Sequence, residues 1–166
     1  MDENSFEYQG LIFPSYLKAG RAADYIIPIA SQFCKGNGLD IGGTPECRFP
    51  GAKVINTSIP DGFHATNLPN EKYDFIFSSH TLEHVENYLE TLLYWRAHLK
   101  EGGVLFLYLP HPDMRYWHPS NCKKHRHSFA PSAMILALQG LGFKNVSCSQ
   151  RDLFWSFAIA GYNQIE

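Results

Sequence analysis

The sequence lacks three features that would each define its class at once: a long apolar run, closely spaced cysteines and an excess of charge. No stretch approaches the roughly 18 consecutive apolar residues of a membrane-spanning helix, and the acidic, polar residues 1–4 do not resemble a secretory signal. The 14 basic and 16 acidic residues leave a net charge of −2, so binding to nucleic acid through bulk positive charge is not expected. The four cysteines include no CxxC pair, and we therefore expect reduced thiols in a cytoplasmic protein.

What the chain does contain is the composition of a globular protein. Of its 166 residues, 45% are hydrophobic and 18% are charged, which is enough apolar material for the core of one domain. We expect a single domain over residues 1–166, with an irregular arm over residues 1–19, where glycine and proline interrupt any period. Aromatic residues reach 14%, and four of the eight histidines fall between His111 and His127.

Two kinds of apolar pattern alternate along the chain. Short, nearly continuous apolar runs predict strands over residues 39–41, 53–59, 73–79, 104–109, 145–149 and 153–159. Apolar residues at helical spacing predict helices over residues 21–33, 83–100 and 131–141. Strands that alternate with helices are typical of an α/β fold, in which a largely parallel sheet has helices on both faces.

A glycine turn follows the first predicted strand, with Asp40 inside the strand and Gly42 and Gly43 after it. Without a Cβ, the backbone of such a turn can approach a ligand closely, and ligands of open α/β sheets bind beyond the carboxyl ends of the strands. Asp40 could organise the turn or accept a hydrogen bond from a ligand amine. The alternative is a tight turn that binds nothing.

The strand at residues 73–79 ends in polar residues that would reach the same edge of the sheet. These residues are Ser78, Ser79 and His80. Thr81 is placed to cap the following helix, whose first turn would hold Glu83 and His84. Because the helix dipole favours an acid there, the simplest interpretation assigns Glu83 to helix initiation and leaves His84 exposed.

Three segments occur in the order LDIGG, YDFIFSSHTLEHV and LKEGGVLFLYLP. Together they resemble the class I S-adenosylmethionine-dependent methyltransferases, and within these the small-molecule branch that carries an LEHV segment, over about residues 36–112. The resemblance implies a Rossmann-like methyltransferase sheet with helices on both faces and S-adenosylmethionine as the cofactor. The methionine part of the cofactor would lie against Asp40, Gly42 and Gly43. The next strand end would line its pocket through Ser78, Ser79 and His80.

The sequence departs from this family pattern in three places. Thr44 stands where the family loop has its second glycine. No acid ends the second strand to hold the ribose hydroxyls, so this role falls to Asn56 or to Asp61. Only about 30 residues separate the glycine turn from residue 73, so we expect the usual third strand and one helix to be missing from this shortened middle segment. The stretch before Pro69 resembles the segment that touches the adenine, which implies contacts from Phe63, His64 and Ala65.

The long loop over residues 110–129 is rich in histidine and basic residues. In the family this loop overhangs the methyl group of the cofactor, so we expect it to form the acceptor site. Methyl transfer to oxygen or nitrogen requires removal of a proton, and a histidine can accept one near neutral pH. The candidate catalytic residues are His111, His125 and His127. An acceptor with a phosphate or carboxylate could be bound by Arg115, Lys123, Lys124 and Arg126.

Two other interpretations of this loop are open. Its zinc-compatible side chains are Cys122, His125 and His127, with His118 or Asp113. Their spacing matches no established tetrahedral pattern, so no metal is expected. The loop could also be a solvated segment that binds nothing.

The sequence therefore predicts a methyltransferase that acts on a small-molecule or sugar-like acceptor, without a nucleic-acid or membrane partner. The departures from the family pattern motivate one alternative, a non-catalytic relative that keeps the fold and acts as a binding or partner protein. A nicotinamide-dependent enzyme is disfavoured, because no GxGxxG follows the first strand.

Overall fold

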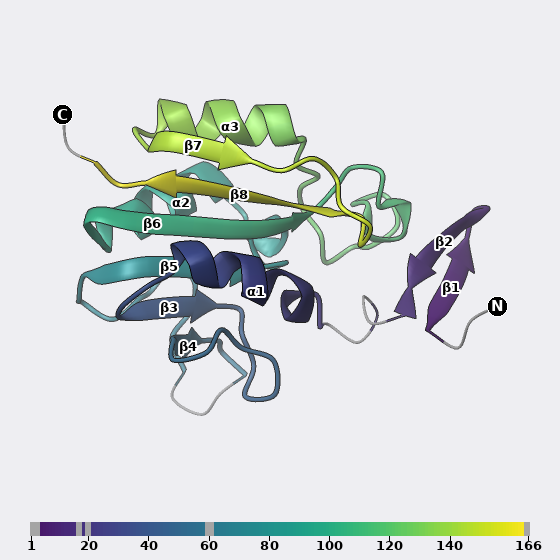
Figure 1. Cartoon of the computed structure of the whole chain (residues 1–166). Helices are drawn as coiled ribbons and strands as arrows, with labels where there is room; N and C mark the ends of the chain where they lie inside the picture. Colours follow the sequence, from purple (N-terminus) through teal and green to yellow (C-terminus); the bar gives the residue numbers. More distant parts are fainter. Residues whose placement is uncertain (1–3, 16–17, 19–20, 59–61, 165–166) are drawn as a thin grey trace.

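The structure is a computed structural model that describes residues 4–15, 18, 21–58 and 62–164 (Figure 1). Its centre is a six-stranded sheet with the strand order β4-β3-β5-β6-β8-β7. The strands of this sheet are β3 (Gly38–Ile41), β4 (Lys53–Ile55), β5 (Tyr73–Ser79), β6 (Leu99–Pro110), β7 (Lys144–Cys148) and β8 (Ser156–Tyr162). Neighbours among β3 to β6 pair in parallel, whereas β8 is antiparallel to both β6 and β7. The predicted α/β class is confirmed.

The remaining elements flank this sheet. They are α1 (Ala23–Phe33), α2 (Tyr88–Ala97), α3 (Pro131–Gly140), the 3-10 helices η2 (Leu82–His84) and η3 (Arg115–Trp117), and a separate hairpin of β1 (Ser5–Tyr8) and β2 (Leu11–Pro14). In Figure 1, α1 lies in front of the sheet and α2 behind it, so both faces are covered. The hairpin lies beyond the carboxyl ends of the parallel strands.

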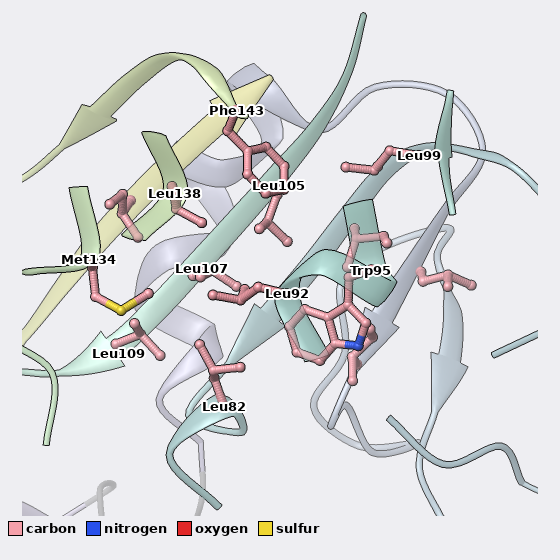
Figure 2. Close-up of a cluster of buried hydrophobic side chains, with 14 of the residues drawn as sticks. Leu82, Leu92, Trp95, Leu99, Leu105, Leu107, Leu109, Met134, Leu138 and Phe143 are labelled. Atoms are coloured by element: carbon pink, nitrogen blue, oxygen red, sulfur yellow. The ribbon is translucent and has the colours of Figure 1, made fainter. Parts of the chain in front are cut away.

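Strand β6 contributes to the core on both faces, because successive side chains of a strand point in opposite directions. Leu105, Leu107 and Leu109 belong to a buried cluster that also contains residues of α2 and α3 (Figure 2). Phe106 and Tyr108 belong to a second buried cluster, which contains residues of α1. A strand covered on both faces requires a continuous apolar run, and this is the pattern that β6 has in the sequence.

The N-terminal residues form a hairpin where an irregular arm was expected. Strands β1 and β2 pair antiparallel through a turn in which Gln9 and Gly10 both have positive φ, as the common tight hairpin turns require. Phe13 of β2 is fully buried and lies 4.8 Å from the Trp155 ring, measured between centroids. The expectation was wrong because the partner of Phe13 is remote in the sequence.

The helix expected over residues 83–100 is interrupted. The chain instead forms η2, three linking residues and then α2, which is capped by Asn87 as its side chain accepts a hydrogen bond from the Glu90 N–H at 3.3 Å. Thr81, the expected cap, donates its hydroxyl hydrogen to the Ser79 carbonyl instead. Strand β6 begins where the helix was expected to end.

The predicted shortening of the middle segment is also present. Strand β4 is an edge strand, and it is shorter than the strand expected over residues 53–59. Between β4 and β5, the described residues contain no helix and form only one isolated bridge, from His64 to Asn67. Within the described chain, no further strand extends the sheet beyond β4.

Two properties inferred from composition can be compared with the structure. No helix among the described residues is both long and apolar enough to cross a bilayer. Each of the four cysteines is a free thiol, and Cys34 and Cys47 are buried.

Replacing Leu107 by alanine should lower the free energy of unfolding by about 3 kcal/mol, because its fully buried side chain leaves a cavity in the sheet. Leu136→Ala is a matched control, since this leucine is 70% exposed on α3, and its effect should stay within about 0.5 kcal/mol. Urea unfolding of the two variants tests the assignment of the core. Equal losses in both variants would contradict it.

Candidate functional site

Two neighbouring cavities lie at the carboxyl ends of the parallel strands. The larger is a cleft of about 1360 Å³ between the ends of β3 and β4, the segment after β4 and the start of α2. The smaller, of about 290 Å³, lies between the glycine turn, η2 and the histidine-rich loop. Both cavities are lined by Gly42, His80, His84 and Lys124. These four residues therefore form the boundary between the two spaces.

The glycine turn after β3 is packed too tightly for side chains at two positions. A Cβ on Gly42, whose φ is +95°, would lie 1.9 Å from the Thr81 hydroxyl oxygen, and one on Gly43 would lie 2.4 Å from the Asp40 carboxylate. That carboxylate accepts a hydrogen bond from the Phe49 N–H at 2.6 Å. Asp40 therefore stabilises the turn through its carboxylate. It also lines the smaller cavity.

Asn56, one of the two residues expected to hold the ribose, already uses its side-chain amide in hydrogen bonds within the protein. Asn56 lines the larger cleft, but its Nδ2 donates to the Gly43 carbonyl at 2.9 Å. Its Oδ1 accepts from both the N–H and the hydroxyl of Ser58 at 2.9 Å. Asn56 thus shapes the turn. Asp61, the alternative ribose ligand, lies outside the described residues.

The segment expected to touch adenine lies on the larger cleft. Phe63, His64 and Ala65 all line it. Ala65 is held in place because its carbonyl accepts a hydrogen bond of 2.7 Å from the buried indole N–H of Trp95. The structure therefore brings this segment together with the glycine turn around one space.

The three polar residues at the end of β5 have different surroundings. The buried Ser78 hydroxyl donates to the Ile41 carbonyl at 2.9 Å and lines neither cavity. The Ser79 hydroxyl oxygen is buried beside the smaller cavity and has no hydrogen-bond partner among the described residues. His80 borders both cavities with a positive φ of 49°, which is uncommon for a residue with a side chain. Burial lowers the pKa of His80 to about 3.

Sequence reasoning did not include Glu83 and His84 in the site, although both line the smaller cavity beside His125. Glu83 is fully buried, and neither of its carboxyl oxygens has a hydrogen-bond partner in the described part of the chain. Its nearest ion-pair atom is Nδ1 of His80, 3.7 Å away. Burial raises the pKa of Glu83 to about 8 and lowers the pKa of His125 to about 4. The sequence signal that could have identified them is an acidic residue followed by a histidine, beginning four residues after the end of β5.

The three predicted catalytic histidines are not brought together. His125 lines the smaller cavity, whereas His111 and His127 line neither cavity. Nε2 of His127 lies 2.9 Å from the Val85 carbonyl, which can only accept, so the ring N–H donates there. His111 lies beside Asp113, with 3.5 Å between Nδ1 and the carboxylate.

The structure does not bring together the zinc-compatible side chains that the sequence offers in the loop over residues 110–129. The potential ligand atoms that converge among the described residues belong to Glu83, His84 and His125. Cys122 lines the smaller cavity but is not part of this cluster. Of the four basic residues considered for an acidic acceptor, Lys124 lines both cavities and Arg126 lines the larger one.

The sequence over residues 17–148 matches the model of a protein family described as a methyltransferase domain. The chain belongs to this methyltransferase family. The family uses S-adenosylmethionine as its methyl donor. No curated protein matches this sequence.

Several solved structures share the fold of this chain. A candidate O-methyltransferase of Nostoc punctiforme gives a TM-score of 0.68 at 13% identity, over 87% of this chain and 57% of its own. A methyltransferase of Thermotoga maritima, a possible histamine N-methyltransferase, gives 0.68 at 16% identity, over 90% of this chain and 93% of its own. Phosphoethanolamine N-methyltransferase 2 of Haemonchus contortus, solved with S-adenosyl-L-methionine, gives 0.64 at 12% identity, over 86% of this chain and 53% of its own. The chain thus spans little more than half the length of the first and third relatives.

Asp40→Asn should remove a pH dependence of stability. Burial raises the pKa of Asp40 from 3.8 to about 6, although hydrogen bonds from the backbone of Phe49 and Gly43 oppose the rise. Between these two values the folded protein binds more protons than the unfolded chain, so this group lowers the free energy of unfolding as the pH rises. Urea unfolding between about pH 4 and pH 7 should show a decline of up to about 3 kcal/mol in the wild type that the variant lacks.

A control of opposite sign is Asp74→Asn. The hydrogen bond from Lys100, at 2.8 Å, lowers the pKa of Asp74. The stabilisation that Asp74 contributes is therefore present at neutral pH and is lost as the pH falls. Parallel pH profiles for the wild type and Asp40→Asn would refute the role assigned to Asp40.

Proposed function

We propose that this chain transfers a methyl group from S-adenosylmethionine to a small-molecule acceptor bound in the smaller cavity. The observation that supports this most is the meeting of two spaces of unequal size at the carboxyl edge of the sheet. The larger space can hold a nucleoside, and the volume of the smaller one, about 290 Å³, suits a small molecule. An arrangement of this kind would allow a methyl donor and an acceptor to meet across one boundary.

The residues around the larger cleft fit the donor. Ile41, Ile55 and Phe63 offer apolar and aromatic surface for a purine ring. The turn at Gly42 and Gly43 presents backbone without side chains, which allows a ligand to approach closely. On the other side of the boundary, Gly43 and the buried Ser79 hydroxyl, which has no partner among the described residues, line the smaller cavity and are available to the end of the donor that reaches it. We therefore assign the donor to these residues, with His64, Ala65 and His80 at the same walls.

The acceptor side carries two ammonium groups. Lys18 and Lys124 both line the smaller cavity. A cation of this kind attracts a carboxylate or a phosphate, and a hydrogen bond between charged groups is stronger than one between neutral groups. We infer an acceptor with an acidic group, and phosphorylated or carboxylated sugars are the first compounds to screen.

S-Adenosylmethionine supplies, when bound, an electrophilic methyl group on a positively charged sulfur, and the electron pair of the broken carbon–sulfur bond stays on that sulfur. The residues of the chain then have two tasks. Trp117 and the glycine turn form walls of the smaller cavity, which can position a bound acceptor. Among the three predicted catalytic histidines, His125 lines this cavity, and its burial keeps the ring neutral with a lone pair available.

Calorimetric titration with S-adenosylmethionine and with S-adenosylhomocysteine tests the donor site directly. We expect binding of both with micromolar dissociation constants. Acceptor screening would follow, with formation of S-adenosylhomocysteine as the readout of turnover. No binding at millimolar ligand would overturn the proposal and favour a non-catalytic role for this fold.

His64→Ala should weaken binding of S-adenosylhomocysteine about tenfold, the loss expected when an aromatic ring that contacts a base is removed. His118→Ala is the matched control. Both histidines are exposed, and in each Nδ1 contacts a hydroxyl two residues later, at 2.9 Å for His64 and 2.8 Å for His118. Only His64 lines the larger cleft. Equal affinities for the two variants would remove His64 from the donor site.

A further inference from the structure

Three potential metal ligands converge beside the smaller cavity. Glu83, His84 and His125 each offer one ligand atom, and these atoms lie within 4.8 Å of one another. The two imidazole rings are 4.6 Å apart between centroids and nearly perpendicular, at 88°. One carboxylate and two imidazoles form a ligand set that holds zinc at catalytic sites while a further position stays open. We propose that this cluster binds one divalent transition-metal ion of the zinc class.

The carboxyl group of Glu83 is the feature that points most directly to a ligand. Its exposed fraction is 0%, and neither oxygen has a hydrogen-bond partner in the described part of the chain. Buried polar groups in proteins are nearly always hydrogen-bonded, and a buried charge is paired or coordinates a metal. The 3.7 Å contact with His80 is longer than a hydrogen bond and does not meet this need. A metal ion at the cluster would meet it.

Both histidines have a nitrogen available for coordination. Nδ1 of His84 lies 2.9 Å from the Lys124 carbonyl. Because a carbonyl only accepts, Nδ1 carries the hydrogen and Nε2 keeps the lone pair. Proteins commonly fix the tautomer of a metal-bound histidine in this way. Nδ1 of His125 is buried and has no hydrogen-bond partner among the described residues.

The spacing of the cluster is compatible with coordination after a small movement. Zinc bonds to nitrogen and oxygen are about 2.0–2.1 Å long, which places tetrahedral ligand atoms about 3.4 Å apart. Contraction from the 4.8 Å limit of the cluster is within the range of side-chain rotation. Glu83 and His125 are buried and fixed by packing, whereas His84 is exposed and can turn toward them.

The ion would lie on the acceptor side of the site, because all three ligands line the smaller cavity. A hydroxyl bound to such an ion has a lowered pKa. Its proton can pass to water, and the oxygen keeps the electron pair that forms the new bond to carbon. The lone pair of His125 would then serve coordination. This catalytic role rests on the proposed function, whereas metal binding itself does not.

Calorimetric titration of the metal-free full chain with zinc chloride, under a phosphine reductant, tests the site. We expect one ion per chain, a micromolar or tighter dissociation constant and a rise in the unfolding temperature. Glu83→Gln keeps the size of the side chain and should weaken binding at least about 100-fold. Glu86→Gln is the matched control, because Glu86 lies three residues further on with an 89% exposed side chain, and it should bind zinc like the wild type.

A second pair of variants tests the histidines. His125→Asn should also lose zinc binding. His98→Asn should retain it, although Nδ1 of His98 lies 2.9 Å from a backbone carbonyl as Nδ1 of His84 does. Cys122→Ser should retain it too, since this cavity-lining thiol is outside the cluster. Cobalt in place of zinc should give visible absorption without the thiolate charge-transfer band.

Absence of saturable binding at one ion per chain, or equal affinity in the wild type and Glu83→Gln, would overturn the proposal. Thermal unfolding of each metal-free variant shows whether it folds, and if Glu83→Gln does not fold, the affinity of His125→Asn decides. Titration of the same samples with S-adenosylhomocysteine separates the two proposals. In the wild type, absence of zinc binding with nucleoside binding present refutes the metal site alone, and the reverse refutes the donor site alone.

Discussion

A buried side-chain hydrogen bond reinforces the pairing between the ends of two central strands. The Ser78 hydroxyl donates to the Ile41 carbonyl at 2.9 Å, where β5 and β3 leave the sheet. Because Ser78 is buried, breaking this bond would leave two polar groups without water, so the strand ends stay fixed relative to each other. Directly beyond it Gly42 packs against Thr81, and Asp40 supports the turn. The glycine turn, η2 and both cavities are positioned from this junction.

Much of the sheet could be predicted, because β3, β5 and β6 are covered on both faces and show this as local apolar runs. The break between η2 and α2 could not be predicted, because the helical spacing of apolar residues continues from Val85 to Tyr88 across the break. Only the cap at Asn87 marks the true start of the helix. The hairpin was missed for a different reason. Its Phe6 packs edge-on against Tyr116, 4.9 Å away between centroids, and such remote contacts leave no local pattern.

The residues that line the larger cleft could mostly be predicted from the sequence, whereas several of those around the smaller cavity could not. Glycines after a strand indicate a close approach of backbone, and the structure places them on the cavities. The preference for acidic residues at helix starts is enough to explain Glu83 from the sequence, so no sequence pattern indicated its burial. That burial depends on the histidine-rich loop, which lies against η2 as the Arg126 N–H donates to the Glu83 carbonyl at 2.8 Å. This contact between the loop and η2 decides which histidine lines a cavity, and the spacing of the histidines in the sequence does not reveal it.

The shared boundary of the two cavities limits how the protein can diversify. Gly42, His80, His84 and Lys124 face both spaces, so a substitution there changes both at once. Trp117 borders the smaller space and not the larger one. Changes in the shape of the smaller cavity are therefore expected to arise in the loop that carries Trp117, while the boundary stays nearly constant among descendants of this chain. Substitutions accepted during evolution would then change the smaller cavity, while the boundary residues and the larger cleft are retained.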